Sequence, residues 1–243
     1  ANETPAFNVN RLCGSGLQAI VSASQSILLG DCDVAIGGGA ENMSRAPYAS
    51  LATRFGARMG DTKMVDMMVG ALHDPFHTIH MGVTAENVAK EFNITREDQD
   101  ALALESHQRA ERAWAEGRFA GQITPVMLKS KKGDVAFEKD EHFRTGAKLE
   151  DFQKMKPVFV NENGTVTAAN ASGINDAAAA VLLMEAGAAK ARGAKPLARL
   201  VGYAHTGLEP KIMGVGPISA TQAVLKRTGL SINDLDVIEA NEA

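Results

Sequence analysis

The sequence predicts an α/β fold built from repeated strand-helix-strand units. Short strand-like runs alternate with apolar residues at helical spacing. Of the 243 residues, 23 are glycines, which suit tight turns and close backbone packing, and only 5% are aromatic. A chain of this length buries roughly 70 to 75% of its unfolded surface. We therefore expect a substantial core and no extensive disorder.

The first forty residues predict one βαβ unit. Residues 5–10 are short, apolar and strand-like, and a Cys-Gly-Ser-Gly turn connects them to apolar residues at helical spacing over residues 17–28. Gly30 should end this helix. Residues 33–36 should form the next strand, and the glycines at 37–39 should end it where a side chain would obstruct a neighbour.

Residues 41–163 are more polar than the preceding residues and predict an inserted loop domain. Six of the ten methionines lie between residues 43 and 81. Residues 95–98 have the pattern of a capping box and open a helix that should stop at Gly117. Residues 129–133 predict a basic turn.

The α/β pattern then resumes. Residues 164–171 are strand-like, so we expect residues 164–196 to rejoin the core formed by residues 1–40. Residues 197–243 should form a second α/β core, with strands at 197–203 and 235–240 around a helix at 220–226. This second βαβ unit has the same order of elements as the first.

Composition excludes several function classes. The 25 Lys and Arg against 29 Asp and Glu give a net charge of -4, which argues against nucleic acid or an anionic membrane as partner. Two cysteines make no disulfide framework, no secretory start is visible and no apolar stretch would span a bilayer, so we expect a cytoplasmic protein. Neither a GxGxxG nor a GxxxxGK[ST] pattern supports nucleotide binding through those motifs.

Cys13 is the candidate nucleophile. It lies at the predicted strand-to-helix turn, where unpaired N–H groups and the positive end of the helix dipole favour a thiolate. Gly14 and Gly16 leave room beside the sulfur for a bulky electrophile such as a thioester. The helix alone ionises the thiol only partly, so a base must supply the rest. The residues also allow a packed structural cysteine, which is our interpretation of Cys32.

Histidines and one asparagine give further candidates. His73, His77 and His80 repeat at i, i+4 and i+7, but Pro75 interrupts any helix there and no His-Glu-x-x-His pattern is present, so no metal site is predicted. His80 is either a substrate-pocket contact or a packed histidine. Asn241 follows the last predicted strand and either orients water or an oxyanion or forms a turn.

Five separated motifs resemble those of the thiolase family in order and spacing. They are NRLCGSG at 10–16, GGGAENMS at 37–44, HMG at 80–82, GTVTAANASG at 164–173 and NEA at 241–243. The match covers the whole chain and is most similar to bacterial β-ketothiolases of biosynthetic type. The resemblance implies duplicated α/β layers (α/β/α/β/α) with an inserted loop domain.

The resemblance implies acyl transfer between CoA thioesters by a ping-pong route. Cys13 would take an acyl group, and a second acetyl-CoA would lose a Cα proton and attack it; in reverse, CoA would cleave a 3-ketoacyl-CoA. CoA and acyl-CoA are then substrates, and no cofactor is implied. The family also implies a homo-oligomer, commonly a tetramer assembled partly through residues 47–65, and a place in fatty acid metabolism or polyhydroxyalkanoate biosynthesis.

The same match implies roles for single residues. Asn241 would hold the water of one oxyanion hole, and the Cys13 N–H would contribute to the other. His80 and Met81 would line the path of the thioester and pantetheine, and Met213 the wall of the acyl pocket. The residues that match the region holding the CoA nucleotide and pantetheine are Leu72, Arg144, Phe159, Ala168 and Ser172.

The sequence departs from the family pattern in two ways. Asp151 stands where a serine is common near the CoA adenine, and it is left out of the site because a carboxylate would repel the nucleotide. The Gly-His-Pro motif with the activating histidine, the Cys-x-Gly-Gly-Gly motif with the second acid/base cysteine, and the opening strand and helices have no counterpart. We therefore expect a chain incomplete at both ends and inactive alone.

Two alternatives stay open at this point. One is a non-catalytic relative that binds acyl-CoA or lipid, and the other is a decarboxylating ketoacyl synthase relative. The first would lack the histidine and second cysteine motifs, and the second would have two histidines in their place.

Overall fold

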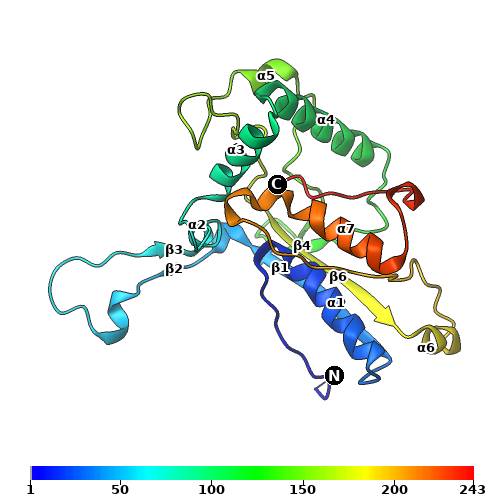
Figure 1. The fold of residues 1–243 in the computed structure, drawn as a ribbon. Coiled ribbons are helices and arrows are strands. Elements are labelled where there is room, and N and C mark those ends of the chain that lie inside the picture. The colour runs from blue at the N-terminus through cyan, green and yellow to red at the C-terminus, as the bar shows by residue number, and fades with distance from the viewer. Residues whose placement is uncertain (1) are drawn as a thin grey trace. The chain divides into compact units, whose positions relative to one another are not determined.

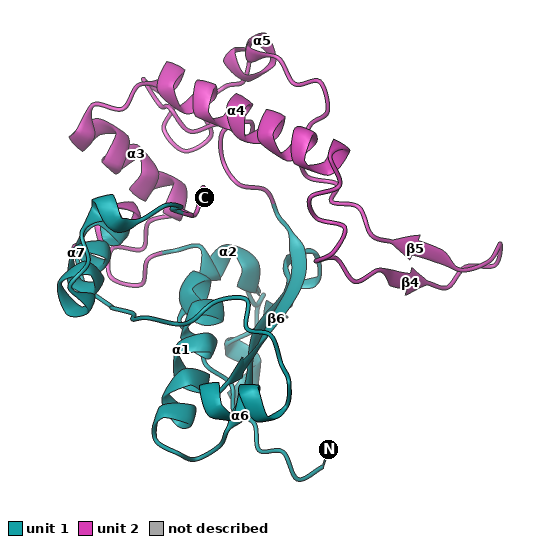
Figure 2. Cartoon of the chain, turned by 90° about the vertical axis from the view of Figure 1, so that its right-hand side faces the viewer, with its two compact units in different colours: residues 1–73, 174–208, 216–238 teal, residues 74–173, 209–215, 239–243 magenta. Residues whose placement is uncertain are grey.

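The computed structural model describes residues 2–243, and its helices and strands confirm the α/β class. The chain forms two compact units, each built from segments far apart in the sequence (Figure 2). Unit 1 holds residues 1–73, 174–208 and 216–238, and unit 2 holds residues 74–173, 209–215 and 239–243. The domain boundaries expected from the sequence divide the chain differently and stay a prediction.

Unit 1 is centred on one helix and a two-stranded ribbon. Helix α1 (Ser15–Leu28) packs on β1 (Val34–Asn42), which pairs antiparallel with β6 (Asp176–Met184) (Figure 1). Its other helices and strands are β2 (Tyr48–Ala49), β3 (Val65–Asp66), α2 (Met67–Ala71), α6 (Ala186–Ala191) and α7 (Gly216–Thr228). Short 3-10 turns are η1 (Leu12–Gly14), η2 (Met43–Arg45), η3 (Ala52–Phe55) and η5 (Ile232–Asp234).

The glycines at 37–39 lie inside β1 and do not end it, which corrects the prediction. A Cβ on Gly37 would lie 2.9 Å from the Cα of Ile20 in α1, and a Cβ on Gly38 would lie 2.8 Å from the carbonyl oxygen of Ala179 in β6. Glycine thus permits the close approach of helix and strands, as expected. The strand continues because its partner β6 continues past the glycines.

Four segments predicted as strand-like form no strand: residues 5–10, 164–171, 197–203 and 235–240. Strand-like side chains do not suffice, because the backbone groups of a strand must bond to a neighbouring strand. Residues 164–171 make a single bridge, between Thr167 and Pro157.

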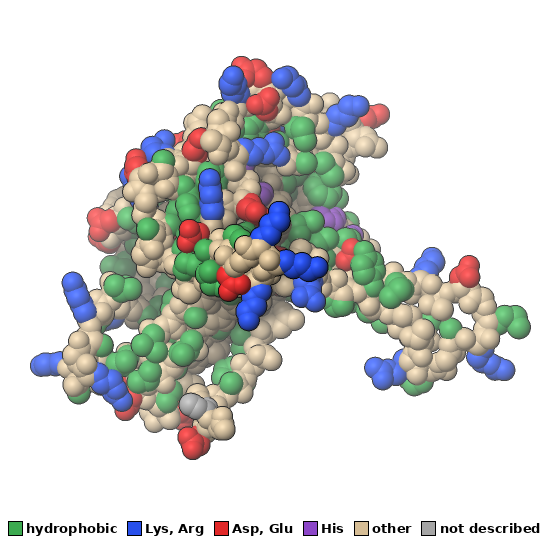
Figure 3. Space-filling view, turned by 180° about the vertical axis from the view of Figure 1, so that it is seen from behind, with side chains coloured by type: hydrophobic (Ala, Val, Ile, Leu, Met, Phe, Trp, Pro, Cys, Tyr) green, Lys and Arg blue, Asp and Glu red, His purple; other side chains and the backbone are tan. Residues whose placement is uncertain are grey.

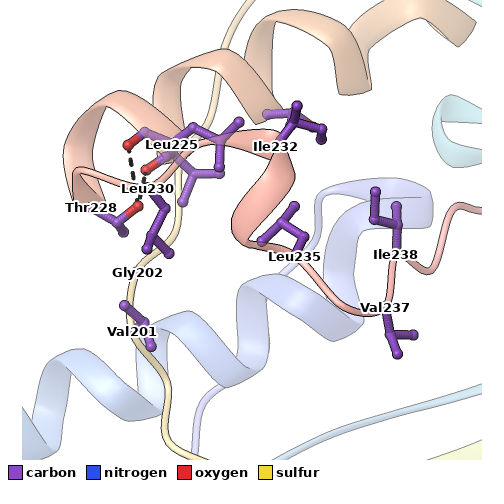
Figure 4. Close-up of a pocket in the computed structure, with 11 residues that line it drawn as sticks. Val201, Gly202, Leu225, Thr228, Leu230, Ile232, Leu235, Val237 and Ile238 are labelled. Atoms are coloured by element: carbon purple, nitrogen blue, oxygen red, sulfur yellow. Dashed lines mark hydrogen bonds between the residues drawn. The ribbon is translucent and has the colours of Figure 1, made fainter.

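Two of these segments, residues 197–203 and 235–240, contribute side chains to an apolar groove in unit 1. The end of α7 lines the same groove, as Figure 4 shows. The groove side chains include Val201, Leu225, Leu230, Ile232, Leu235 and Val237.

The arm, defined here as residues 48–66, projects from unit 1 and contains β2 and β3 (Figure 1). Apolar side chains extend along it (Figure 3). Phe55 is 95% exposed and Met59 is 98% exposed. The arm therefore presents large apolar groups to solvent.

Unit 2 is mainly helical. It contains α3 (Met81–Phe92), α4 (Arg96–Ala115), β4 (Val126–Leu128), β5 (Val135–Phe137), α5 (Leu149–Gln153) and the 3-10 segment η4 (Pro210–Val215). The predicted capping box is confirmed: the Asp98 N–H donates to the Thr95 hydroxyl, and the Thr95 N–H donates to the Asp98 carboxylate. The basic turn at 129–133 is also confirmed, as the tip of the hairpin that joins β4 to β5.

Among the described residues, none of the helices combines the length and the apolar character that crossing a bilayer requires.

Candidate active site

Cys13 lies in the turn η1, two residues before α1 begins at Ser15, so its predicted position at a helix start is confirmed. The Asn10 side-chain oxygen accepts from the Leu12 N–H at 2.9 Å. The Ser15 hydroxyl accepts from the Arg11 N–H at 2.9 Å and donates to the Leu12 carbonyl at 2.7 Å. These polar residues of the NRLCGSG motif therefore hold the turn that presents the cysteine.

The surroundings of Cys13 in unit 1 are open. The side chain is exposed, a Cβ on Gly16 would meet nothing within 4 Å, and one on Gly14 would meet only the Arg11 Cβ at 3.7 Å. Leu12 adopts a positive φ of 50°, a conformation that costs a side-chain-bearing residue about 1 kcal/mol or more. Backbone strain thus adjoins the candidate nucleophile, as it often does at functional sites.

The end of the GGGAENMS motif is tied to β6. The Ser44 N–H and hydroxyl both donate to the Asp176 carboxylate, at 3.0 and 2.5 Å. The Ser44 hydroxyl is the main cause that lowers the pKa of Asp176 from its ordinary 3.8. The serine therefore fixes the point where β1 ends and the chain leaves the ribbon.

In unit 2, His80 is the N-cap of α3. Its Nδ1 accepts from the Gly82 N–H at 3.0 Å, and its ring stacks on the Phe159 ring with centroids 4.6 Å apart. A Cβ on Gly82 would lie 2.1 Å from the Phe159 ring. The HMG motif thus has a geometric basis, because glycine gives Phe159 room beside the histidine. Both interpretations of His80 are compatible with this half-buried stack.

Glu86, on the same helix, holds the segment that contains Ala168 and Ser172. Its carboxylate accepts from the Thr165 N–H at 2.9 Å, the Thr165 hydroxyl at 2.8 Å and the Val166 N–H at 2.9 Å. Glu86 is only 8% exposed. A buried carboxylate with several donors is a strong tether, so the positions of His80 and of residues 165–166 are coupled through α3.

A second buried acid fixes the same segment from α4. Asp100, 1% exposed, accepts from the Arg96 guanidinium at 2.8 Å and from the Asn170 amide at 2.9 Å. The Asn170 side-chain oxygen accepts from the Thr167 N–H at 2.7 Å. Thr167 is buried, whereas Ala168 and Ser172 are exposed. The network therefore anchors the loop and leaves the predicted contact residues at the surface.

Asn241 lies in the segment of unit 2 that meets Ser172. The Ser172 N–H donates to the Ala243 carbonyl at 2.9 Å. The Asn241 side-chain oxygen accepts from the Ala243 N–H at 3.0 Å, which is the local bond of a turn-forming asparagine. The Ser106 hydroxyl donates to Glu242. Residues 235–240, immediately before Asn241, form no strand, which corrects the predicted placement of Asn241 at a strand end.

Met213 lies in η4, a segment of unit 2 that packs on α3. The Asn87 amide donates to the Lys211 carbonyl at 3.0 Å, and the His77 Nε2 lies 3.0 Å from the Glu209 carboxylate. Met213 itself is 38% exposed. These contacts attach η4 both to α3 and to the loop before His80.

Arg144 is exposed, but its backbone is fixed on α4. Its N–H donates to the Nδ1 of His107 at 3.1 Å. Partial burial, then the charges of His142 and Arg144, lower the pKa of His107 from its ordinary 6.5.

Leu72 is half-buried at the end of α2 in unit 1. Asp151 is exposed, with its carboxylate 3.8 Å from the Lys154 ammonium, and its exclusion from the site stays a prediction.

Unit 2 thus brings together most of the predicted contact residues, connected through the two long helices and the loop at 164–173. Cys13 and Leu72 belong to unit 1. Sequence reasoning missed the residues that hold the loop at 164–173 and the segment around Arg144. They are Glu86, Asp100, Asn170 and His107. One signal was available, since Glu86 lies on the same helical face as Val83 and Ala89, where a carboxylate needs buried donors.

Among residues 2–243, the structure shows no group of three metal-ligating side chains. His73, His77 and His80 share no helix, since His73 follows α2 and His80 precedes α3.

The chain belongs to the thiolase family. Residues 1–187 match the family described as "Thiolase, N-terminal domain" and residues 194–243 match "Thiolase, C-terminal domain". The fold agrees: the crystal structure of human mitochondrial 3-ketoacyl-CoA thiolase superposes with a TM-score of 0.96 at 45% identity, covering 100% of this chain and 62% of that one. The expected thiolase fold is therefore confirmed.

Curated relatives extend the match. The beta-ketothiolase BktB of Cupriavidus necator is 67% identical over 239 residues, 98% of this chain and 61% of the relative. The acetyl-CoA acetyltransferase of Chromobacterium violaceum is 50% identical over 242 residues, 99% of this chain and 62% of the relative. A structure of the human thiolase in complex with CoA has a TM-score of 0.95 at 43% identity, covering 100% of this chain and 60% of that one. The chain therefore spans about 61% of the length of these relatives.

Proposed function

We propose that the whole protein is a thiolase that transfers acyl groups between CoA thioesters, with Cys13 as the acyl carrier. The observation that supports this most directly is an exposed cysteine in the turn that begins α1, in a chain of the thiolase family. A helix start stabilises a thiolate and offers N–H groups to a developing oxyanion.

The proposed reaction has two halves. The Cys13 sulfur attacks the carbonyl of an acyl-CoA, a sulfur-carbon bond forms, and CoA departs and takes up a proton. A second acetyl-CoA then gives its Cα proton to a base, and the resulting carbanion attacks the Cys13 thioester. Cys13 leaves as thiolate and a 3-ketoacyl-CoA is released. The acid and base groups would come from the two family motifs that these residues do not contain.

The other site residues take binding roles in this proposal. Asn241 would hold the water of one oxyanion hole and the Cys13 N–H would complete the other. Met81 and the His80–Phe159 stack would face the pantetheine, with Met213 at the acyl pocket. The remaining residues proposed to contact CoA are Leu72, Arg144, Ala168 and Ser172. Their exposure, apart from that of the half-buried Leu72, supports contact with a ligand.

We also propose a homo-oligomer, a tetramer in the family pattern, that uses the arm at residues 48–66. Large exposed apolar groups such as Phe55 and Met59 support an association surface there. Two free cysteines, one of them exposed, support a reducing cytoplasm. A role in fatty acid metabolism or polyhydroxyalkanoate biosynthesis belongs to the same proposal.

Trapping the acyl group tests the proposed nucleophile. The whole protein is incubated with acetyl-CoA, quenched in acid, digested and analysed by mass spectrometry. We expect one acetyl group on the Cys13 peptide, released by hydroxylamine as a thioester is. Cys32→Ser should retain the label, whereas Cys13→Ala should lose both label and turnover. A protein that binds CoA but never becomes acetylated would instead be a non-catalytic relative.

A further inference from the structure

The segment that contains Arg144 is held on α4 by two side chains one helical turn apart. The Arg144 N–H donates to the His107 Nδ1 at 3.1 Å. The Gly146 N–H donates to both oxygens of Glu111, at 3.2 and 3.1 Å. Both acceptors lie on one face of α4, where the Phe143 ring also stacks on the Trp114 ring with centroids 6.2 Å apart. The two hydrogen bonds therefore fix the backbone around Arg144 in addition to this packing.

Of the side-chain types, histidine is the one whose ordinary pKa lies near neutral pH, so His107 is the acceptor that a change of pH can convert. Because Nδ1 accepts a hydrogen bond, the neutral ring has its proton on Nε2. A second proton would convert Nδ1 into a donor that faces the Arg144 N–H. Two donors cannot bond to each other, so protonation removes this anchor.

The groups around His107 oppose protonation on balance. The loop presents His142, whose ring lies 5.9 Å away, and Arg144. From α5, the fully buried Phe152 ring lies at 5.8 Å, and the acids of that helix, Glu150 and Asp151, are exposed. On α4, Glu111 at i+4 favours a cation, but it already accepts from Gly146. Burial and two like charges therefore outweigh one acid.

We propose that His107 is a proton-sensitive positioning residue for the nucleotide end of CoA. Neutral His107 holds the Arg144 segment on α4 in its binding position, and protonated His107 releases it. This inference rests on the proposed function, in which Arg144 contacts the CoA nucleotide. A released segment binds the nucleotide with a loss of preorganisation, which raises KM for CoA substrates.

Protonation of His107 also has an opposing electrostatic effect. A protonated His107 adds positive charge near an anionic ligand, which by itself would lower KM at acid pH. The ring is half-buried beneath the loop, whereas the Arg144 side chain is exposed and free to reach the ligand. We therefore expect the loss of position to outweigh the added charge.

The test is the pH dependence of KM for acetoacetyl-CoA thiolysis in the whole protein, from about pH 5 to pH 8. The comparison is between wild type, His107→Gln and His107→Leu. A Gln side chain can accept the Arg144 N–H but does not titrate, and Leu cannot accept it. Wild-type KM should rise about 3- to 10-fold as pH falls below 6.5, the range given by loss of one hydrogen bond.

The variants should distinguish the effect of the Arg144–His107 hydrogen bond from the effect of the charge on His107. His107→Gln should have a nearly flat KM, with only the change due to the ligand's own phosphate, whose second pKa is about 6. His107→Leu should have a KM raised about 3- to 10-fold at every pH. His142→Gln should move the wild-type transition to higher pH, because it removes a like charge. If His107→Leu does not fold, His107→Gln and His142→Gln still decide the matter.

A substrate without a nucleotide completes the test. With the N-acetylcysteamine thioester of acetoacetate, KM should be the same for wild type and both His107 variants at each pH. A wild-type protein that turns over neither substrate contradicts the proposed function. Turnover with parallel KM profiles in wild type and His107→Gln, or a wild-type KM that falls at acid pH, overturns the role of His107 and leaves the proposed function intact.

Discussion

Replacing Glu86 should weaken the tether between α3 and the loop at 164–173 while leaving the helix itself intact. Glu86→Ala removes the acceptor of the Thr165 and Val166 N–H groups, both bonded at 2.9 Å. Val166 is 6% exposed, so water cannot easily replace the carboxylate there. Each buried N–H without an acceptor costs about 1 to 3 kcal/mol, which gives about 2 to 6 kcal/mol for Glu86→Ala.

Glu86→Gln is the matched variant. Its carbonyl oxygen can accept from both N–H groups and its amide can donate to the Thr165 hydroxyl, which turns to accept. It loses the charge but also the cost of burying that charge, so we expect a loss of about 1 kcal/mol. Exposed Glu91 on the same helix provides the control, and Glu91→Ala should change stability by less than about 0.5 kcal/mol.

Urea unfolding at 25 °C, followed by circular dichroism, measures these differences. A thiolysis assay on the whole protein adds a functional readout, in which Glu86→Gln should retain KM and Glu86→Ala should raise it. Equal unfolding free energies for Glu86→Ala and Glu86→Gln would refute the reasoning, because the acceptor that Gln keeps and Ala lacks would then contribute nothing to stability.

Three further predictions concern packing, pH and activity. Gly82→Ala places a Cβ about where the Phe159 ring lies and should cost about 1 to 3 kcal/mol in a thermal melt, whereas Gly121→Ala, with open space around it, should be nearly neutral. The Thr95 hydroxyl lowers the pKa of Asp98 below its ordinary 3.8. The folded state thus binds fewer protons than the unfolded state, so stability should fall as pH drops through this range, and less so in Asp98→Asn. Finally, the isolated 243-residue chain should show no thiolysis of acetoacetyl-CoA above buffer, and robust turnover would contradict the dependence on the missing motifs.

Local signals in the sequence were sufficient for the elements that depend on near neighbours. The turn before α1, the capping box at Thr95 and Asp98 and the basic hairpin tip were all predicted where they lie. Each is stabilised by bonds between residues no more than a few positions apart. The wrong predictions were strands, such as residues 5–10, whose hydrogen bonds require a distant partner.

The residues of the candidate site fall into the same two groups: those that local motifs identify and those that only the folded structure identifies. Motifs identified Cys13, His80 and Asn241 as residues of interest, and composition argued against nucleic acid as the main partner. They did not identify His107, because its role depends on a bond to Arg144, which lies 37 positions away. No spacing rule connects two such residues before the chain folds.

The amino-acid sequence by itself determined the family, the starts of α1 and α4, and the cysteine that the start of α1 presents, because these depend on short patterns of residues. Only the tertiary structure decided which buried acids hold the contact loops, as Glu86 holds residues 165–166 and Asp100 holds Asn170. A carboxylate has the same chemistry on any helix, and its partner is set by which donors folding places beside it in a region that water does not reach.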